Sequence, residues 1–130
     1  MQLRQLVSLY KGFSDPTRLR ILNLLTSRSH LKVGEIASIL QIPQSTVSRQ
    51  LAQLRACSLI QDERDGTWVK YSIVESEIVK DGQLFATVRL ASKMCAELNE
   101  DLQRMVELVG EEDGNGDAAE SAAVRAKKKG

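Results

Sequence analysis

The chain has 130 residues, of which 42% are hydrophobic and 27% are charged, and its formal net charge is +1. This length allows one domain with a single core. No apolar run approaches the roughly 20 residues of a membrane-spanning helix, the N-terminus lacks the pattern of a signal peptide, and two cysteines are too few for a disulfide framework. We therefore expect a soluble cytoplasmic protein.

Charge is distributed unevenly along the chain. Residues 1–71 hold ten Lys or Arg against five acidic residues, whereas residues 72–130 hold eight against twelve. This asymmetry favours a polyanion as the partner of the first half, although a solvated surface of mixed charge explains it equally well.

The first two predicted helices follow from hydrophobic spacing and end signals. An amphipathic helix ends near Gly12–Phe13. Asp15 is then a good N-cap, and Pro16 suits the first turn of a second helix, because its missing N–H would be unbonded there. This second helix is apolar on more than one side, so it should be the central, most buried helix. Ser27–His30 interrupts it.

The next two predicted helices form a helix-turn-helix unit. One spans about Val33–Leu40 and the other runs from Gln44 to about Ser58, with the short turn Gln41–Pro43 between them. The second of these helices buries an apolar stripe. Its outward residues are Gln44, Ser45, Thr46, Ser48, Arg49 and Gln50.

These outward residues match what a helix needs to read DNA from the major groove. Arg49 is the best candidate for a bidentate contact with guanine, and Gln44 or Gln50 for adenine. Ser45 and Thr46 suit phosphate near the start of the helix. Any one of them alone could be a solvated side chain or a cap, but together they predict DNA binding.

Two strands, Leu59–Arg64 and Thr67–Ile73, are predicted to follow. Between them lies Asp65–Gly66, a dipeptide typical of a two-residue hairpin with a type I′ turn. One face of the second strand can pack on the core while the other meets a ligand, as in a wing. The residues expected to contact phosphates there, without reading sequence, are Arg64, Thr67 and Lys70.

A heptad seam predicts one long helix near the C-terminus. Its residues are spaced 4, 3, 4, 3, 4, 3 and 4 apart: Leu84, Val88, Ala91, Cys95, Leu98, Leu102, Met105 and Val109. Such a helix spans about 40 Å and cannot bury its whole seam against a small domain. We expect a second copy to cover it, with packing on the same subunit as the alternative. The expected dimer interface is Leu3, Leu6, Leu84, Val88, Ala91, Cys95, Leu98 and Leu102.

The remaining residues define the domain limits and exclude catalysis. Residues 110–130 show no core pattern and are predicted to be a disordered tail, which leaves residues 1–109 as one DNA-binding and dimerisation domain. The sequence also gives no basis for predicting an enzyme. It has one His, and it lacks a Gly-rich phosphate loop, a Cys-x-x-Cys motif and clustered carboxylates.

Three segments, Ser14–Leu22, Gln44–Leu51 and Arg64–Tyr71, resemble the ArsR/SmtB family of winged-helix repressors. The resemblance covers roughly residues 3–74. It implies a mainly α winged helix-turn-helix with a small β-hairpin and a long C-terminal dimerisation helix. It also implies a homodimer that represses its operator and releases it when an inducer binds, often a metal or metalloid ion.

The chain departs from that family in its metal ligands. Metalloid-sensing members carry Cys-Val-Cys where this chain has Lys32-Val33-Gly34, and no His follows His30, so no metal site or cofactor is predicted. Pro43 also stands where a capping Ser is common, which predicts a slightly shifted start for the fourth helix.

Two alternatives to an inducible repressor stay open. Cys57 and Cys95 could form a redox switch or part of a soft-metal site, although each also fits the pattern of a buried hydrophobic residue. Otherwise, the winged helix could bind another protein, or bind DNA without any inducer.

Overall fold

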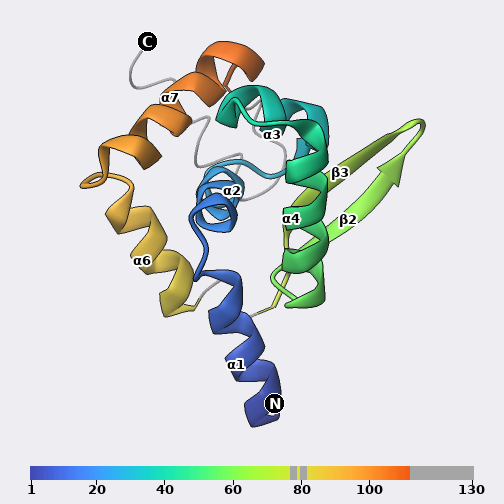
Figure 1. Cartoon of the computed structure of the whole chain (residues 1–130), viewed down its shortest axis with the longest axis vertical. Coiled ribbons are helices and arrows are strands. Elements are labelled where there is room, and N and C mark those ends of the chain that lie inside the picture. The colour runs from blue at the N-terminus through green and yellow to red at the C-terminus, as the bar shows by residue number, and fades with distance from the viewer. Residues whose placement is uncertain (77–78, 80–81, 112–130) are drawn as a thin grey trace.

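Helix α2 lies at the centre of the molecule, and the other elements surround it (Figure 1). The computed structural model describes residues 1–76, 79 and 82–111. In chain order the elements are α1 (Leu3–Gly12), α2 (Pro16–Thr26), β1 (Leu31–Lys32), α3 (Val33–Leu40), α4 (Gln44–Ala56), β2 (Ile60–Asp65), β3 (Trp68–Ile73), α6 (Gln83–Ala91) and α7 (Ala96–Val109). The expected mainly α fold with a small β-hairpin is confirmed.

The start of α2 has the predicted capping geometry. The Asp15 carboxylate accepts a hydrogen bond of 3.0 Å from the backbone N–H of Arg18, and Pro16 is the first helical residue. The helix then buries Ile21, Leu22 and Leu24 completely. Its position at the centre of the core is confirmed.

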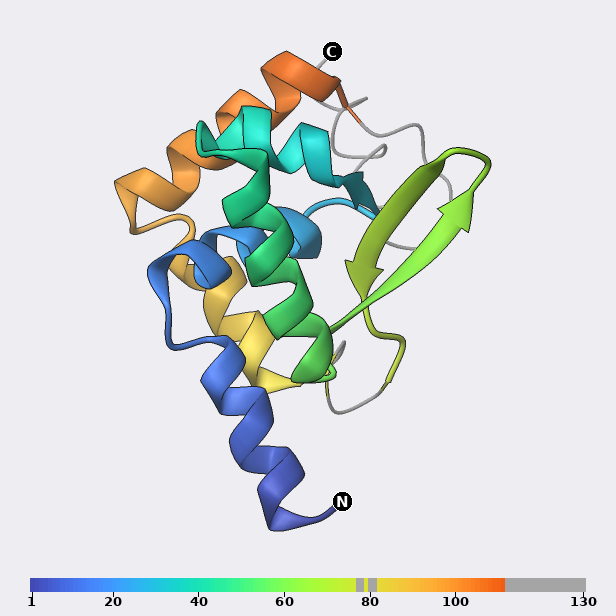
Figure 2. The same ribbon diagram turned by 45° about the vertical axis from the view of Figure 1, so that its right-hand side comes forward.

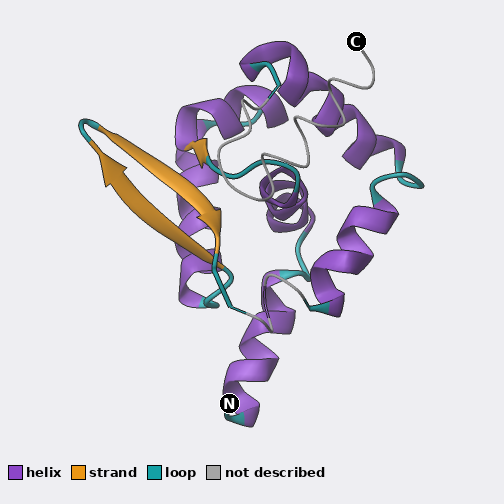
Figure 3. Ribbon diagram, turned by 180° about the vertical axis from the view of Figure 1, so that it is seen from behind, coloured by secondary structure: helices purple, strands orange, loops and turns teal. Residues whose placement is uncertain are grey.

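The sheet is antiparallel, with strand order β1-β3-β2 (Figure 3). β1 was not predicted, because two residues are too few to show a strand period; its Leu31 pairs with Tyr71 of β3. The hairpin turn also differs from the prediction. Asp65 pairs with Trp68, so the two-residue loop is Gly66–Thr67, and only Gly66 has a positive φ, of 66°. Glycine at the first central position is the requirement of a type II′ turn.

The single long helix predicted from the heptad seam is wrong. The structure has two helices, α6 and α7, separated by a turn over residues 92–95 (Figure 2). In this turn the Ser92 hydroxyl donates to the carbonyl of Arg89 over 2.7 Å, and Cys95 has the extended backbone of an N-cap. The bend lets α6 pack on α2 while α7 packs on both α2 and α3. Packing of both helices against their own chain therefore stabilises this arrangement more than one continuous helix would.

The predicted tail, residues 110–130, lies outside the described residues except for Gly110 and Glu111. The boundary at residue 109 therefore stays a prediction. Within the described part of the chain, no helix is long and apolar enough to cross a membrane.

Candidate nucleic-acid interface

The helix-turn-helix unit is built from α3 and α4. Gln41 ends α3 in the left-handed conformation, with φ 59° and ψ 44°, and this turns the chain toward α4. The Pro43 carbonyl accepts hydrogen bonds from the N–H groups of Thr46 and Val47 at 3.0 and 3.1 Å, so α4 begins at Gln44 without a side-chain cap. Pro43 therefore takes the capping position, α4 begins at Gln44, and the slight shift that was expected from Pro43 is wrong.

The predicted stripe of Val47, Leu51 and Leu54 is fully buried, and it fixes which side of α4 faces outward. Of the predicted reading residues, four are exposed: Gln44, Ser45, Ser48 and Arg49. Within the described residues, the Arg49 guanidinium bonds only its own helix, through a 3.4 Å hydrogen bond to the hydroxyl of Thr46. Its other N–H donors remain available for a bidentate contact.

Thr46 and Gln50 are half-buried, and Gln50 is in addition held by Arg18 of α2. The Arg18 guanidinium donates to the Gln50 side-chain oxygen over 3.2 Å and to the Lys11 carbonyl of α1 over 2.9 Å. An adenine contact needs both the oxygen and the nitrogen of a carboxamide. Gln44, which is exposed, is therefore better placed than Gln50 to read adenine.

Sequence reasoning missed Arg18 because its partner lies 32 residues further along the chain. It also missed Ala52 and Gln53, which are exposed and extend the outer side of α4. The helical spacing of Ser45, Ser48 and Ala52 was the available signal. An alanine on this side can contact the methyl group of thymine.

The wing carries the other predicted DNA contacts. Arg64 and Thr67 are exposed near its tip. Lys70 instead forms a 2.8 Å ion pair with Asp65 across the hairpin. This hydrogen bond lowers the pKa of Asp65 and raises the pKa of Lys70, so both groups are charged at neutral pH. The Lys70 charge is thus already balanced by a carboxylate.

Trp68 is a further exposed residue of the wing that the sequence reasoning did not select. It is 59% exposed, and the Lys32 ammonium lies 4.5 Å from its ring centroid in a cation–π contact. This contact ties the wing to β1 beside the start of α3.

An Asp65→Asn substitution should strengthen binding to any DNA duplex, because it frees Lys70 and removes a negative charge from the wing. The slope of log affinity against log salt concentration should steepen by about 1, the value for one added phosphate contact. Fluorescence anisotropy over a salt series measures both. Glu100→Gln on α7 removes the same charge from an exposed site away from the wing and should change neither. An unchanged slope in the Asp65 variant would show that Lys70 does not reach phosphate.

The residues predicted for the dimer interface fall into three groups. Leu3, Leu6 and Cys95 are exposed. Leu84, Ala91 and Leu102 are half-buried. Val88 and Leu98 are buried within the chain itself. The seam is therefore divided between the core and the surface.

The two cysteines lie at helix ends. Cys57 is half-buried at the end of α4 and packs against the hydrophobic core, whereas Cys95 is exposed at the start of α7. Among residues 1–76, 79 and 82–111, no group of three or more His, Cys, Asp or Glu side chains is placed to hold a metal ion. A thiol-based sensor stays a prediction.

Comparison with known proteins matches this arrangement to one family. The sequence model of the family described as "Bacterial regulatory protein, arsR family" matches residues 15–62, from the N-cap of α2 into β2. An HTH-type transcriptional regulator of Methanocaldococcus jannaschii is 37% identical over 70 residues, which are 54% of this chain and 79% of that protein. The chain belongs to the ArsR family.

Two further relatives of this ArsR-family chain have known roles or structures. The transcriptional repressor PagR of Bacillus anthracis is 38% identical over 73 residues, which are 56% of this chain and 73% of PagR. The homodimeric winged helix-turn-helix DNA-binding domain Mb0332 from Mycobacterium bovis has a TM-score of 0.60 and 31% identity, covering 70% of this chain and 81% of that one. The chain spans about half the length of the arsenic resistance regulators that it matches.

Family membership makes this ArsR-family chain a DNA-binding transcription regulator and not an enzyme. The matched region contains α2, β1, α3 and α4 entirely, so the shared part includes the complete helix-turn-helix unit.

Proposed function

We propose that the protein binds a two-fold symmetric operator as a homodimer, with α4 of each protomer in the major groove. The observation that carries this proposal is the contrast between the two sides of α4. Its apolar stripe is fully buried, whereas Ser45, Ser48 and Arg49 are exposed on the opposite side. Arg64 and Thr67 of the wing then approach phosphates, which adds affinity without sequence specificity.

The proposed dimer rests on α1, which projects from the rest of the molecule (Figures 1 and 2). Four large hydrophobic residues at helical spacing are exposed on it: Leu3, Leu6, Val7 and Tyr10. A ten-residue helix is marginal in water unless its apolar side is covered. A second copy supplies the same surface across a two-fold axis. The homodimeric state of Mb0332 supports the dimer as such.

Helix α6 extends the apolar surface of α1. Phe13, directly after α1, contacts Phe85 of α6 edge-on at 5.0 Å between ring centroids. Leu90 of α6 and Met94 in the following turn are exposed. We therefore place the dimer interface on α1 and the outer side of α6, while Val88 and Leu98 support it from inside the protomer.

We further propose that operator binding represses transcription and that an inducer releases the protein. PagR, a relative over most of its own length, is a transcriptional repressor, which supports the first part. The inducer can be sought by titrating metal ions and oxidants against the DNA complex; release by an oxidant would favour the cysteine-based alternative.

The test is selection of bound DNA from a random pool, followed by affinity measurements on the selected site. We expect an inverted repeat with half-site centres about one helical turn apart. An Arg49→Ala substitution should weaken operator binding by about 5- to 150-fold and relax the preference at one base pair. Arg49→Lys is the matched control, because it keeps the charge at the same position but lacks the planar fork of a bidentate contact, so it should also relax that base preference.

Failure to select any motif would contradict sequence-specific binding and favour a protein-interaction module. An Arg49→Lys protein that binds the operator with wild-type affinity and base preference would indicate that Arg49 acts only through its charge. In that case Arg49 would not be the residue that reads guanine.

A further inference from the structure

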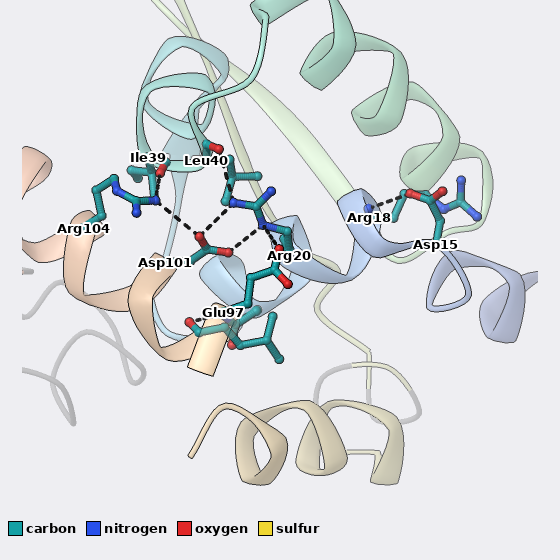
Figure 4. Close-up of polar contacts among 10 residues, drawn as sticks. Asp15, Arg18, Arg20, Ile39, Leu40, Glu97, Asp101 and Arg104 are labelled. Carbon is teal, nitrogen blue, oxygen red and sulfur yellow. Dashed lines mark hydrogen bonds and ion pairs between the residues drawn. The ribbon is translucent and has the colours of Figure 1, made fainter. Parts of the chain in front are cut away.

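A buried carboxylate joins α7 to the helix-turn-helix unit (Figure 4). Asp101 of α7 is 1% exposed. Arg20 of α2 donates to its two oxygens at 2.8 and 3.0 Å, and Arg104 lies 3.5 Å from one of them. The hydrogen bond to Asp101 raises the pKa of Arg20, against the opposing effect of burial. The cluster therefore holds one buried carboxylate between two cations.

Both guanidinium groups also reach the carbonyl end of α3. Arg20 donates to the Leu40 carbonyl over 3.2 Å, and Arg104 donates to the Ile39 carbonyl over 2.7 Å. The last carbonyls of a helix have no partner within the helix and need one elsewhere. Arg20 and Arg104, oriented by Asp101, supply these donors just before the turn at Gln41 that leads into α4.

Two other contacts fix α7 on the same side of the domain. The side-chain amide of Asn23 donates to the Leu98 carbonyl over 3.1 Å. Arg28 donates to the carbonyls of Gly110 and Val109 at 2.6 and 3.2 Å, at the end of α7. The backbone of α7 is thus held along its length, so it is a fixed base from which Asp101 can orient the two arginines.

We propose that Asp101 is a positioning residue for DNA recognition: it aligns Arg20 and Arg104 on the end of α3 and so fixes the angle at which α4 enters the groove. This inference rests on the proposed role of α4. A buried ion pair adds little net stability compared with apolar packing, but removing its carboxylate leaves the charges of the two arginines uncompensated at that point. Loss of Asp101 would leave two neighbouring cations and free the end of α3.

The expected consequence is a loss of specificity and not of general DNA affinity. Base contacts require a defined helix orientation, whereas phosphate contacts depend mainly on the number of cations at the interface. The exposed side chains of α4 and the wing are unchanged when Asp101 is replaced. Binding to the operator should therefore weaken while binding to unrelated duplex DNA does not.

The test compares Asp101→Asn with Glu97→Gln in the full chain. Glu97 is on the same helix and lies 3.9 Å from the same Arg20 nitrogen, but its side chain is 70% exposed. After thermal unfolding has defined a temperature at which each variant is folded, affinities for operator and unrelated duplex are measured over a salt series. We expect Asp101→Asn to lose about tenfold in operator affinity, with unchanged non-specific affinity and salt slope. Glu97→Gln should match the wild type in all three.

A folded Asp101→Asn protein that discriminates operator from unrelated DNA like the wild type would overturn the proposal. If that variant does not fold, Arg20→Lys replaces it, because a lysine keeps the charge but lacks the planar fork with which Arg20 binds both Asp101 oxygens and the Leu40 carbonyl. This variant should also lose operator affinity while its affinity for unrelated duplex DNA is unchanged. If it distinguishes operator from unrelated DNA like the wild type, the positioning role of Asp101 is again refuted. Arg49→Ala is measured in parallel: if it too leaves operator binding unchanged, the role of α4 is wrong, and not only that of Asp101.

Discussion

Replacing Leu6 by Glu is expected to convert the protein into a monomer and to lower its operator affinity by about 10²- to 10⁴-fold, the range that separates bivalent from single-site binding. Leu6 lies in the middle of the exposed apolar stripe of α1. In the proposed dimer a two-fold axis would bring each Glu into the apolar interface, where an unpaired charge is costly. Sedimentation velocity at micromolar concentration measures the first effect, and fluorescence anisotropy on the operator measures the second.

Gln5→Glu is the matched control for this substitution. Gln5 is exposed on the same helix, and its side-chain oxygen accepts a hydrogen bond of 2.7 Å from the backbone N–H of Gln2, which a carboxylate can also accept. This variant should remain dimeric. A dimeric Leu6→Glu protein with normal affinity would exclude α1 from the interface.

Alanine at Gly12 is expected to lower the free energy of unfolding by about 1–3 kcal/mol, the usual range for added volume in a packed core. Gly12 is buried at the end of α1, and a Cβ there would overlap the side chain of Leu59, which is itself fully buried and cannot move aside freely. Denaturant unfolding monitored by circular dichroism measures the loss.

Gly34→Ala makes the same chemical change in another helix and should have the opposite sign. Its Cβ would meet nothing nearer than the Gln44 side-chain oxygen at 3.7 Å, an ordinary contact. Because alanine restricts the unfolded chain more than glycine, we expect a gain of about 0.4–1 kcal/mol. Equal losses at both positions would show that close packing against Leu59 is not the cause.

Features set by neighbouring residues could be predicted from the sequence. The cap at Asp15, the buried stripe of α4 and the exposed position of Arg49 each depend on residues within one or two helical turns. Their physical causes, an N-cap hydrogen bond and a 3.6-residue period, act locally. The hairpin was found for the same reason, but its turn was displaced by one residue because Gly66 alone supplies the positive φ.

Features that depend on distant partners could not be predicted. Residues 92–95 contain neither Gly nor Pro, the usual sequence signals for a helix end, and the heptad pattern continues through them. The bend arises because α7 reaches α3 and its Asp101 pairs with Arg20, 81 residues away. The hydrogen bond from Arg18 to Gln50 likewise joins α2 to α4, and no pattern within either helix predicts this contact.

The position of Trp68 has a practical consequence for spectroscopy. It is the one tryptophan of the chain, and it lies largely exposed on the wing with the Lys32 ammonium over its ring. Its emission therefore reports on the wing and not on the hydrophobic core. A ligand that covers the wing should change both its emission maximum and its access to a soluble quencher such as iodide. The native chain thus carries its own fluorescent reporter of wing contact, without any added label.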